Sequence, residues 1–235
     1  MSDPLRVALV CEGPTDKVVI DAALSNLLGT SPYIVKQLHP EESLAFGILG
    51  TGWGGVYRWC RQSVTRSTGP IRNDPLFNFY DLLVLHLDAE VAEESYANAG
   101  IEDSTNDLPC AHPCPPPENT TNPLRAVLLR WIEEVTIPPS TVFCTPSKNI
   151  ETWVLCALYP HDSAVLSGQV ECEPDPCACL QAKPADRRLV RGGRKDTSRY
   201  RDRAGEISGA WPRVRVLCGE AERFSTDTMN LFSVA

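Results

Sequence analysis

Residues 81–90 read DLLVLHLDAE, and residues 6–16 read RVALVCEGPTD. In both stretches a short apolar run is followed at once by acidic residues. A short apolar run bounded by polar and turn residues is typical of a strand that is buried on both faces. The two stretches therefore predict two buried strands, each with carboxylates at its carboxyl end.

The segments around these two strands alternate between strand and helix patterns. Further strands are predicted over residues 33–38 and 141–145. A helix ending at Gly29 follows the first strand, and later helices are predicted over residues 56–64, 91–98, 122–135 and 149–158. Such alternation predicts an α/β fold with a mainly parallel sheet flanked by helices.

The chain has 235 residues, which at ~150 residues per domain corresponds to between one and two domains. We expect an α/β core over residues 1–160 and a basic, partly helical extension over residues 161–235 that packs on this core. Residues 100–122 are predicted to be an insertion without regular structure, because they contain Pro109, Pro113, Pro115, Pro116 and Pro117.

The expected location of the protein is the cytoplasm, without contact to a membrane. No apolar run approaches the ~18 residues that a membrane-spanning helix needs. The first residues, Met1-Ser2-Asp3-Pro4, lack the basic segment and apolar core of a signal peptide.

Charge is unevenly distributed along this chain of net charge −8. Residues 73–124 contain ten acidic residues and no Lys or Arg, whereas residues 187–223 contain eleven basic and five acidic residues. An acidic and a basic pole suit a metal site beside a phosphate-binding surface, and two solvated faces are the alternative. Within the basic segment, Arg191, Arg194 and Lys195 flank a Gly-Gly pair and are predicted to bind phosphate.

Four carboxylates are predicted to converge at the carboxyl edge of the sheet. Glu12 ends the first strand, Asp16 lies one helical turn later, and Asp88 and Glu90 end the strand over residues 81–87. Their mutual repulsion would be relieved by a divalent cation, and hard oxygen ligands favour Mg²⁺ or Mn²⁺. Glu12 is either a further ligand or a general acid–base.

These same residues carry a family resemblance. The stretch Glu12-Gly13-Pro14-Thr15-Asp16 resembles the first motif of the Toprim domain, and Asp88-Ala89-Glu90 resembles its Asp-x-Asp motif, with Glu in place of the second Asp. The resemblance covers about residues 5–160 and implies a Toprim-like sheet. Nuclease-type Toprim proteins, including the overcoming-lysogenization-defect class, carry a further Lys and Glu, which Lys148 and Glu151 match. A capping role is the alternative for Glu151.

The resemblance implies a metal-dependent nuclease that hydrolyses phosphodiester bonds of DNA or RNA. Glu12, Lys148 and Glu151 would be its catalytic residues. Such nucleases often act in bacterial defence against phage beside an ATPase, and no ATPase motif occurs here, so the ATPase would be a separate protein. The alternative is a non-catalytic Toprim-like module that binds nucleic acid or a partner.

Five of the ten cysteines fall in two groups, one of which also holds His112. Clustered Cys and His favour metal binding in a reducing compartment, and free thiols are the alternative. A closed zinc site of Cys110, Cys114, Cys172 and Cys177, with Cys179 or His112 as alternates, would tether the proline-rich insertion to the second group.

Overall fold

The computed structural model describes residues 3–41, 48–102 and 107–232. Its centre is a four-stranded sheet in the order β2-β1-β3-β4, in which all neighbouring strands are parallel. The strands are β1 (Leu5–Val10), β2 (Tyr33–His39), β3 (Leu82–His86) and β4 (Thr141–Cys144). The predicted α/β class with a parallel sheet is confirmed.

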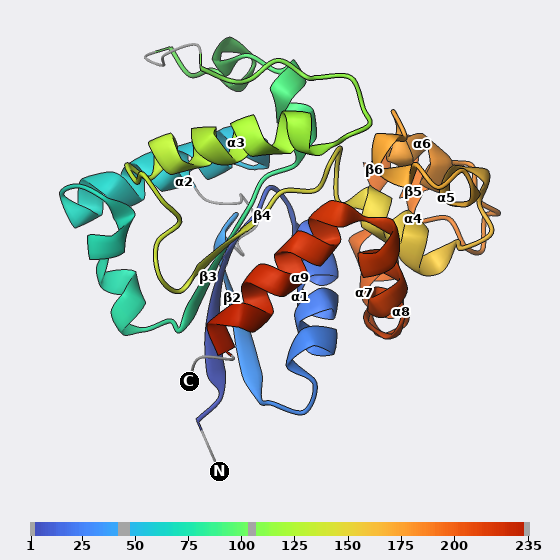
Figure 1. Cartoon of the computed structure of the whole chain (residues 1–235), viewed down its shortest axis with the longest axis horizontal. Coiled ribbons are helices and arrows are strands. Elements are labelled where there is room, and N and C mark those ends of the chain that lie inside the picture. Colours follow the sequence, from blue (N-terminus) through green and yellow to red (C-terminus); the bar gives the residue numbers. More distant parts are fainter. Residues whose placement is uncertain (1–2, 42–47, 103–106, 233–235) are drawn as a thin grey trace.

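Helices cover both faces of this sheet (Figure 1). One face packs against α2 (Gly52–Ser67) and α3 (Glu118–Trp131), and the other against α1 (Pro14–Leu28), α4 (Glu151–Leu158), α8 (Ala204–Leu217) and α9 (Gly219–Phe232). Side chains alternate along each strand, so Val7 and Leu9 enter one core while Ala8 and Val10 enter the other. All four residues are fully buried, which explains the uninterrupted apolar runs.

The C-terminal extension contributes to the main hydrophobic core rather than lying outside it. Trp153 of α4 packs edge-on against Trp211 of α8, with ring centroids 5.4 Å apart, and stacks on Phe224 of α9 at 6.1 Å. The smaller elements of the extension are α5 (Ser163–Leu166), η5 (Val170–Cys172), α6 (Pro176–Gln181), β5 (Val190–Arg191), β6 (Arg194–Lys195) and α7 (Thr197–Asp202). In the described part of the chain, no helix combines the length and apolar character needed to span a membrane.

The prediction of a helix over residues 91–98 is wrong. The structure instead has two short 3-10 turns, η3 (Ala89–Glu93) and η4 (Tyr96–Ala99). Two backbone amides at the start of this segment donate hydrogen bonds to the β4–α4 loop, from Ala89 to the Pro146 carbonyl at 3.0 Å and from Glu90 to the Lys148 carbonyl at 2.9 Å. These contacts shape the segment as a turn.

The helix expected from Asn122 begins earlier, at Glu118, so residues 118–122 of the predicted insertion are helical and Pro123 lies inside α3. Tertiary contacts explain the added turn. Thr120 Oγ1 accepts a hydrogen bond from the His112 N–H at 2.9 Å, and the Thr121 hydroxyl donates to Glu220 Oε1 at 2.6 Å. Neither contact is visible in the local sequence pattern.

Two further 3-10 turns, η1 (Ile71–Asn73) and η2 (Pro75–Asn78), connect α2 to β3. They lie at the amino edge of the sheet, because β3 begins only a few residues later. The carboxyl edge, where the acidic residues were predicted to gather, is formed by the loops that follow β1, β3 and β4. This edge holds the candidate site.

Candidate active site

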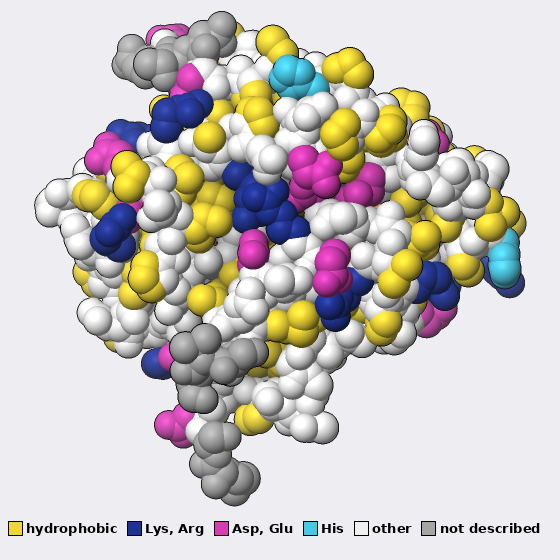
Figure 2. Space-filling model, in the orientation of Figure 1, with side chains coloured by type: hydrophobic (Ala, Val, Ile, Leu, Met, Phe, Trp, Pro, Cys, Tyr) yellow, Lys and Arg dark blue, Asp and Glu magenta, His cyan; other side chains and the backbone are white. Residues whose placement is uncertain are grey.

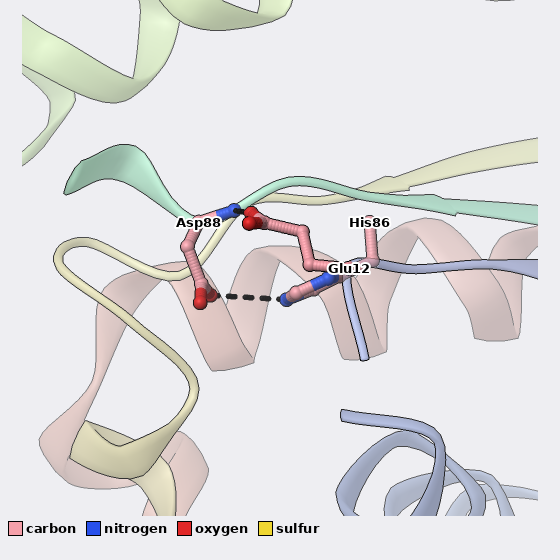
Figure 3. Close-up of side chains that lie close together, drawn as sticks. All are labelled: Glu12, His86 and Asp88. Atoms are coloured by element: carbon pink, nitrogen blue, oxygen red, sulfur yellow. Dashed lines mark hydrogen bonds and ion pairs between the residues drawn. The ribbon is translucent and has the colours of Figure 1, made fainter. Parts of the chain in front are cut away.

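The carboxyl ends of β1 and β3 bring two acidic residues into direct contact. The strands are parallel neighbours, with Val10 opposite Leu85. Glu12 and Asp88 follow these positions, and the Asp88 backbone N–H donates a hydrogen bond of 2.8 Å to Glu12 Oε1 (Figure 3). The contact fixes the orientation of the Glu12 carboxylate at the edge of the sheet.

Asp16 lies in the first turn of α1 and turns back toward the same edge. Pro14 opens the helix, a position where its missing N–H costs nothing. The Gly13 N–H donates to Asp16 Oδ2 at 2.7 Å, so this carboxylate caps the start of the helix. Only 2% of Asp16 is exposed, and its Oδ2 lies 3.9 Å from His86 Nδ1.

His86, the last residue of β3, is completely buried between two of these carboxylates. Its Nε2 lies 3.0 Å from Asp88 Oδ1. Burial alone would lower the pKa of the imidazole, but the neighbouring carboxylates, Asp88 foremost, raise it to about 9. At neutral pH, His86 is therefore a buried cation that offsets part of the negative charge.

A second cation reaches this edge from the C-terminal extension. Lys195 of β6 places its Nζ 2.7 Å from Glu151 Oε2 and 4.0 Å from Asp16 Oδ1. The Tyr200 hydroxyl donates to the other oxygen of the fully buried Glu151, Oε1, at 3.0 Å. Burial acts to lower the pKa of Lys195, but the surrounding carboxylates, Glu151 foremost, raise it by more. The net pKa lies above the ordinary value, so Lys195 stays charged.

These two cations do not fully compensate the carboxylates. Burial raises the pKa of Glu12 well above its ordinary value, and the charge of Asp88 raises it further. Burial also raises the pKa of Asp16, although His86 and Lys195 act to lower it. Burial likewise raises the pKa of Glu151, against the effect of Lys195. Crowded carboxylates with raised pKa values are typical of functional sites and favour an added cation.

The group Glu12, His86 and Asp88 can hold a metal ion, because each residue offers one ligand atom and these atoms lie within 4.8 Å of one another. The His86 imidazole offers a nitrogen once its proton has left, and Glu12 and Asp88 offer carboxylate oxygens. Their hard oxygen atoms suit a divalent cation, and the raised pKa of Glu12 indicates that such a cation would relieve repulsion. The residues therefore fit a divalent metal ion.

Two other predicted residues lie at the rim. Glu90 is exposed, and its Oε2 accepts a hydrogen bond from Asn149 Nδ2 at 3.0 Å. The Lys148 ammonium pairs with Glu93 Oε1 at 2.8 Å and not with the buried carboxylates. The β4–α4 loop directs Lys148 toward η3, and Lys195 holds the position beside the carboxylates that we expected for Lys148.

The predicted phosphate-binding residues separate in the structure. Arg191 and Arg194 are exposed on the β5–β6 hairpin, whereas Lys195 reaches the carboxylates. Many of the other basic residues of the extension form ion pairs: Arg199–Asp196, Arg203–Glu206, Arg215–Glu222 and Arg223–Glu220. In the middle of the face that Figure 2 shows, basic and acidic side chains lie next to one another. The extension therefore neutralises much of its own charge.

The cysteine groups lie differently from the predicted zinc site. Cys114 and Cys172 form a disulfide, Cys110 is exposed, and the Cys177 sulfur accepts a hydrogen bond from Asn149 Nδ2 at 3.9 Å. A sulfur bonded to sulfur has no thiolate to offer a metal. Within residues 3–41, 48–102 and 107–232, no cysteine belongs to a group that could hold a metal ion. The insertion is tethered to the second group covalently instead.

Sequence reasoning missed three residues of this site: His86, Asn149 and Tyr200. His86 left a signal, because it is the one polar residue within the apolar run LLVLHL and stands two positions before Asp88, so both side chains point the same way from an extended chain. Asn149 and Tyr200 left none, because only tertiary packing brings them to Glu90 and Glu151.

No family model, curated protein or solved structure matches the chain. The resemblance to Toprim proteins therefore rests on the two acidic motifs alone.

Proposed function

We propose that this protein is a metal-dependent nuclease of the Toprim type, which hydrolyses phosphodiester bonds of DNA or RNA. The observation that carries the proposal is the contact between Glu12 and Asp88, with Asp16 beside them and a lysine ammonium 4.0 Å from Asp16. Phosphodiester hydrolysis needs oxygen ligands for a metal and positive charge near the phosphate, and this edge offers both.

In the proposed reaction, Glu12 and Asp88 would hold Mg²⁺ or Mn²⁺, whereas Asp16, which was also predicted as a ligand, lies outside the group of ligand atoms within 4.8 Å of one another. A bound divalent cation polarises a phosphoryl oxygen and lowers the pKa of the attacking water. The likeness of the two acidic stretches to the Toprim motifs supports this choice of chemistry. The same likeness suggests a setting, namely anti-phage defence with a separate ATPase as partner.

The remaining residues position charge. Lys195 stabilises the negative charge that develops on the phosphate oxygens. Glu151 and Tyr200 hold Lys195 in place, because Glu151 binds the ammonium through one oxygen and the Tyr200 hydroxyl through the other. His86 orients the Asp88 carboxylate from the buried side. Arg191 and Arg194, exposed on the hairpin, contact flanking phosphates.

The test is cleavage of labelled single- and double-stranded DNA and RNA in Mg²⁺, Mn²⁺ or EDTA. Asp88→Asn should lower metal-dependent cleavage by about 100-fold or more, which is the usual cost of losing a key charge at such a site. Asp81→Asn is the matched control, because Asp81 lies just before β3, at the amino end of the strand, and pairs with Arg6. It should retain full activity.

Two results would contradict the proposal. Cleavage that persists in EDTA, or in Asp88→Asn at the wild-type rate, would mean that this site does not carry the reaction. If no substrate is cleaved but nucleic acid is bound, the chain is a non-catalytic Toprim-like module.

A further inference from the structure

Four aromatic residues pack together on the face of the sheet that α2 and α3 cover: Trp53, Tyr57, Tyr96 and Trp131. Trp53 stacks on Trp131 with ring centroids 6.4 Å apart and an angle of 21°, and it meets Tyr96 edge-on at 5.8 Å. Trp131 Nε1 donates to the Tyr96 hydroxyl at 2.8 Å, and that hydroxyl donates to Asp107 Oδ1 at 2.6 Å. The ring of Trp53 therefore rests on a hydrogen-bonded support.

The backbone places Trp53 at the edge of the candidate active site. The Gly52 N–H donates a hydrogen bond of 2.8 Å to the Glu12 carbonyl, and Trp53 is the next residue, with its Cα ~3.8 Å further on. Gly54 lets this first turn of α2 pack directly on η4, since an added Cβ there would lie 2.6 Å from the Ala99 Cβ. The position of Trp53 relative to Glu12 is thus fixed by backbone contacts.

Within the aromatic group, Trp53 and Tyr57 keep part of their surface in contact with solvent. Trp131 and Tyr96 are only 3% and 5% exposed, whereas Trp53 is partly exposed. Ile48, in the loop before α2, is 89% exposed. A partly exposed indole backed by other rings is the arrangement on which proteins stack nucleic-acid bases.

We propose that Trp53 stacks an unpaired base next to the scissile phosphate, so that the substrate of the nuclease is single-stranded nucleic acid. The statement that the stacked base lies next to a scissile phosphate rests on the proposed nuclease function. In a duplex each base is already paired and stacked on its neighbours, and it would have to leave the helix to reach Trp53. A single strand meets no such cost.

The groove between α1, β2 and α8 is less suited to a nucleic-acid strand. It has a volume of about 740 Å³, but its walls carry Asp21 and Glu41 as well as Lys17 and Arg201. Carboxylates along a groove repel a phosphate backbone. Asp21 and Glu41 therefore offset the attraction that Lys17 and Arg201 would give a phosphate backbone in this groove.

The test measures binding of a fluorescein-labelled 15-nucleotide single strand and of a hairpin duplex by anisotropy, with Ca²⁺ replacing Mg²⁺ to prevent turnover. Trp53→Leu keeps apolar volume but removes the ring, and it should weaken single-strand binding by about fivefold or more, as loss of a stacked base does. Trp53→Phe should retain most of the affinity. Phe79→Ala is the control, because Phe79 is 63% exposed at the opposite edge of the sheet.

The outcomes separate the two proposals. If Trp53→Leu binds the single strand as the wild type does, or if wild type binds the duplex equally well, the stacking platform is overturned while metal-dependent cleavage can still stand. If Trp53→Leu loses single-strand binding but no variant cleaves nucleic acid, the platform stands and the nuclease is overturned. A thermal melt of each variant shows that the fold is kept.

Discussion

The three carboxylates at the carboxyl edge of the sheet and the single carboxylate of Glu171 differ in what they contact. At the carboxyl edge of the sheet, Asp16 and Asp88 lie beside the His86 imidazole, and Glu12 accepts a hydrogen bond from the Asp88 backbone N–H. Glu171 accepts hydrogen bonds from two backbone amides at the start of α9, Gly219 at 2.7 Å and Glu220 at 3.1 Å. Asp16 and Asp88 lie beside the His86 imidazole in addition to accepting backbone hydrogen bonds, whereas Glu171 accepts hydrogen bonds from neutral backbone donors.

The difference shows that burial of an acid does not by itself indicate a functional site. Glu171 caps a helix, and its backbone partners cannot be exchanged for a metal ion without unwinding α9. At the sheet edge, by contrast, the ligand atoms of Glu12, His86 and Asp88 lie within 4.8 Å of one another, so an added cation could bind between them. Of the two arrangements, the one at the sheet edge is therefore the candidate site.

Replacing glutamate by glutamine should affect cleavage very differently at Glu12 and at Glu171. Glu12→Gln is expected to lower nuclease activity by about 100-fold or more, because a metal ligand is removed, whereas Glu171→Gln should leave activity within about threefold. Without metal, Glu12→Gln should also melt at a higher temperature than wild type, since it removes a carboxylate whose pKa burial and Asp88 raise. Equal activities of the two variants would remove the distinction.

Breaking the ion pair between Lys195 and Glu151 should destabilise the fold. Lys195→Met leaves Glu151 buried without its cation, which is expected to cost about 4 kcal/mol of unfolding free energy, measured by denaturant titration. Adding Glu151→Gln should recover much of this stability, because the buried charge is then gone. A double variant as unstable as Lys195→Met would mean that the pair does not act as a unit.

Glu171 should make stability depend on pH. Burial raises its pKa from 4.5 to about 7 in the folded protein, so the folded state keeps a proton that the unfolded chain releases. Stability is then lost as pH rises from about 4.5 to 7, by an amount on the order of 3 kcal/mol. Glu171→Gln should lack this part of the dependence in thermal melts at pH 5 and pH 8, and parallel curves for both proteins would contradict the assignment.

The smallest effect is expected at the exposed hairpin. Replacing Arg191 and Arg194 together by Ala should weaken nucleic-acid binding evenly across sequences. It should also reduce the slope of log affinity against log salt by ~0.7–0.9 for each phosphate that the hairpin no longer binds. Arg215→Ala is the control, because Arg215 pairs with Glu222 at 2.6 Å. An unchanged slope in the double variant would show that the hairpin does not bind phosphate.

Much of the α/β core followed from local patterns in the sequence. The apolar runs of β1 and β3 predict buried strands because both of their faces are covered by helices. The motif Gly-Pro-Thr-Asp predicts the start of α1, since proline suits the first helical turn and Asp16 caps the Gly13 amide. Turns and helix starts that depend on distant contacts, such as η3 and the first turn of α3, were not predictable in this way.

The sequence by itself determined which acids stand at strand ends, because parallel strands carry their carboxyl ends to one edge and Glu12 and Asp88 follow directly from two apolar runs. Only the tertiary structure decided which cations meet them. Lys195 lies 44 residues after Glu151 and pairs with it because the β5–β6 hairpin folds back over α4, whereas the nearer Lys148 turns to Glu93. Long side chains pair according to where the folded backbone carries them, and spacing along the chain does not record that.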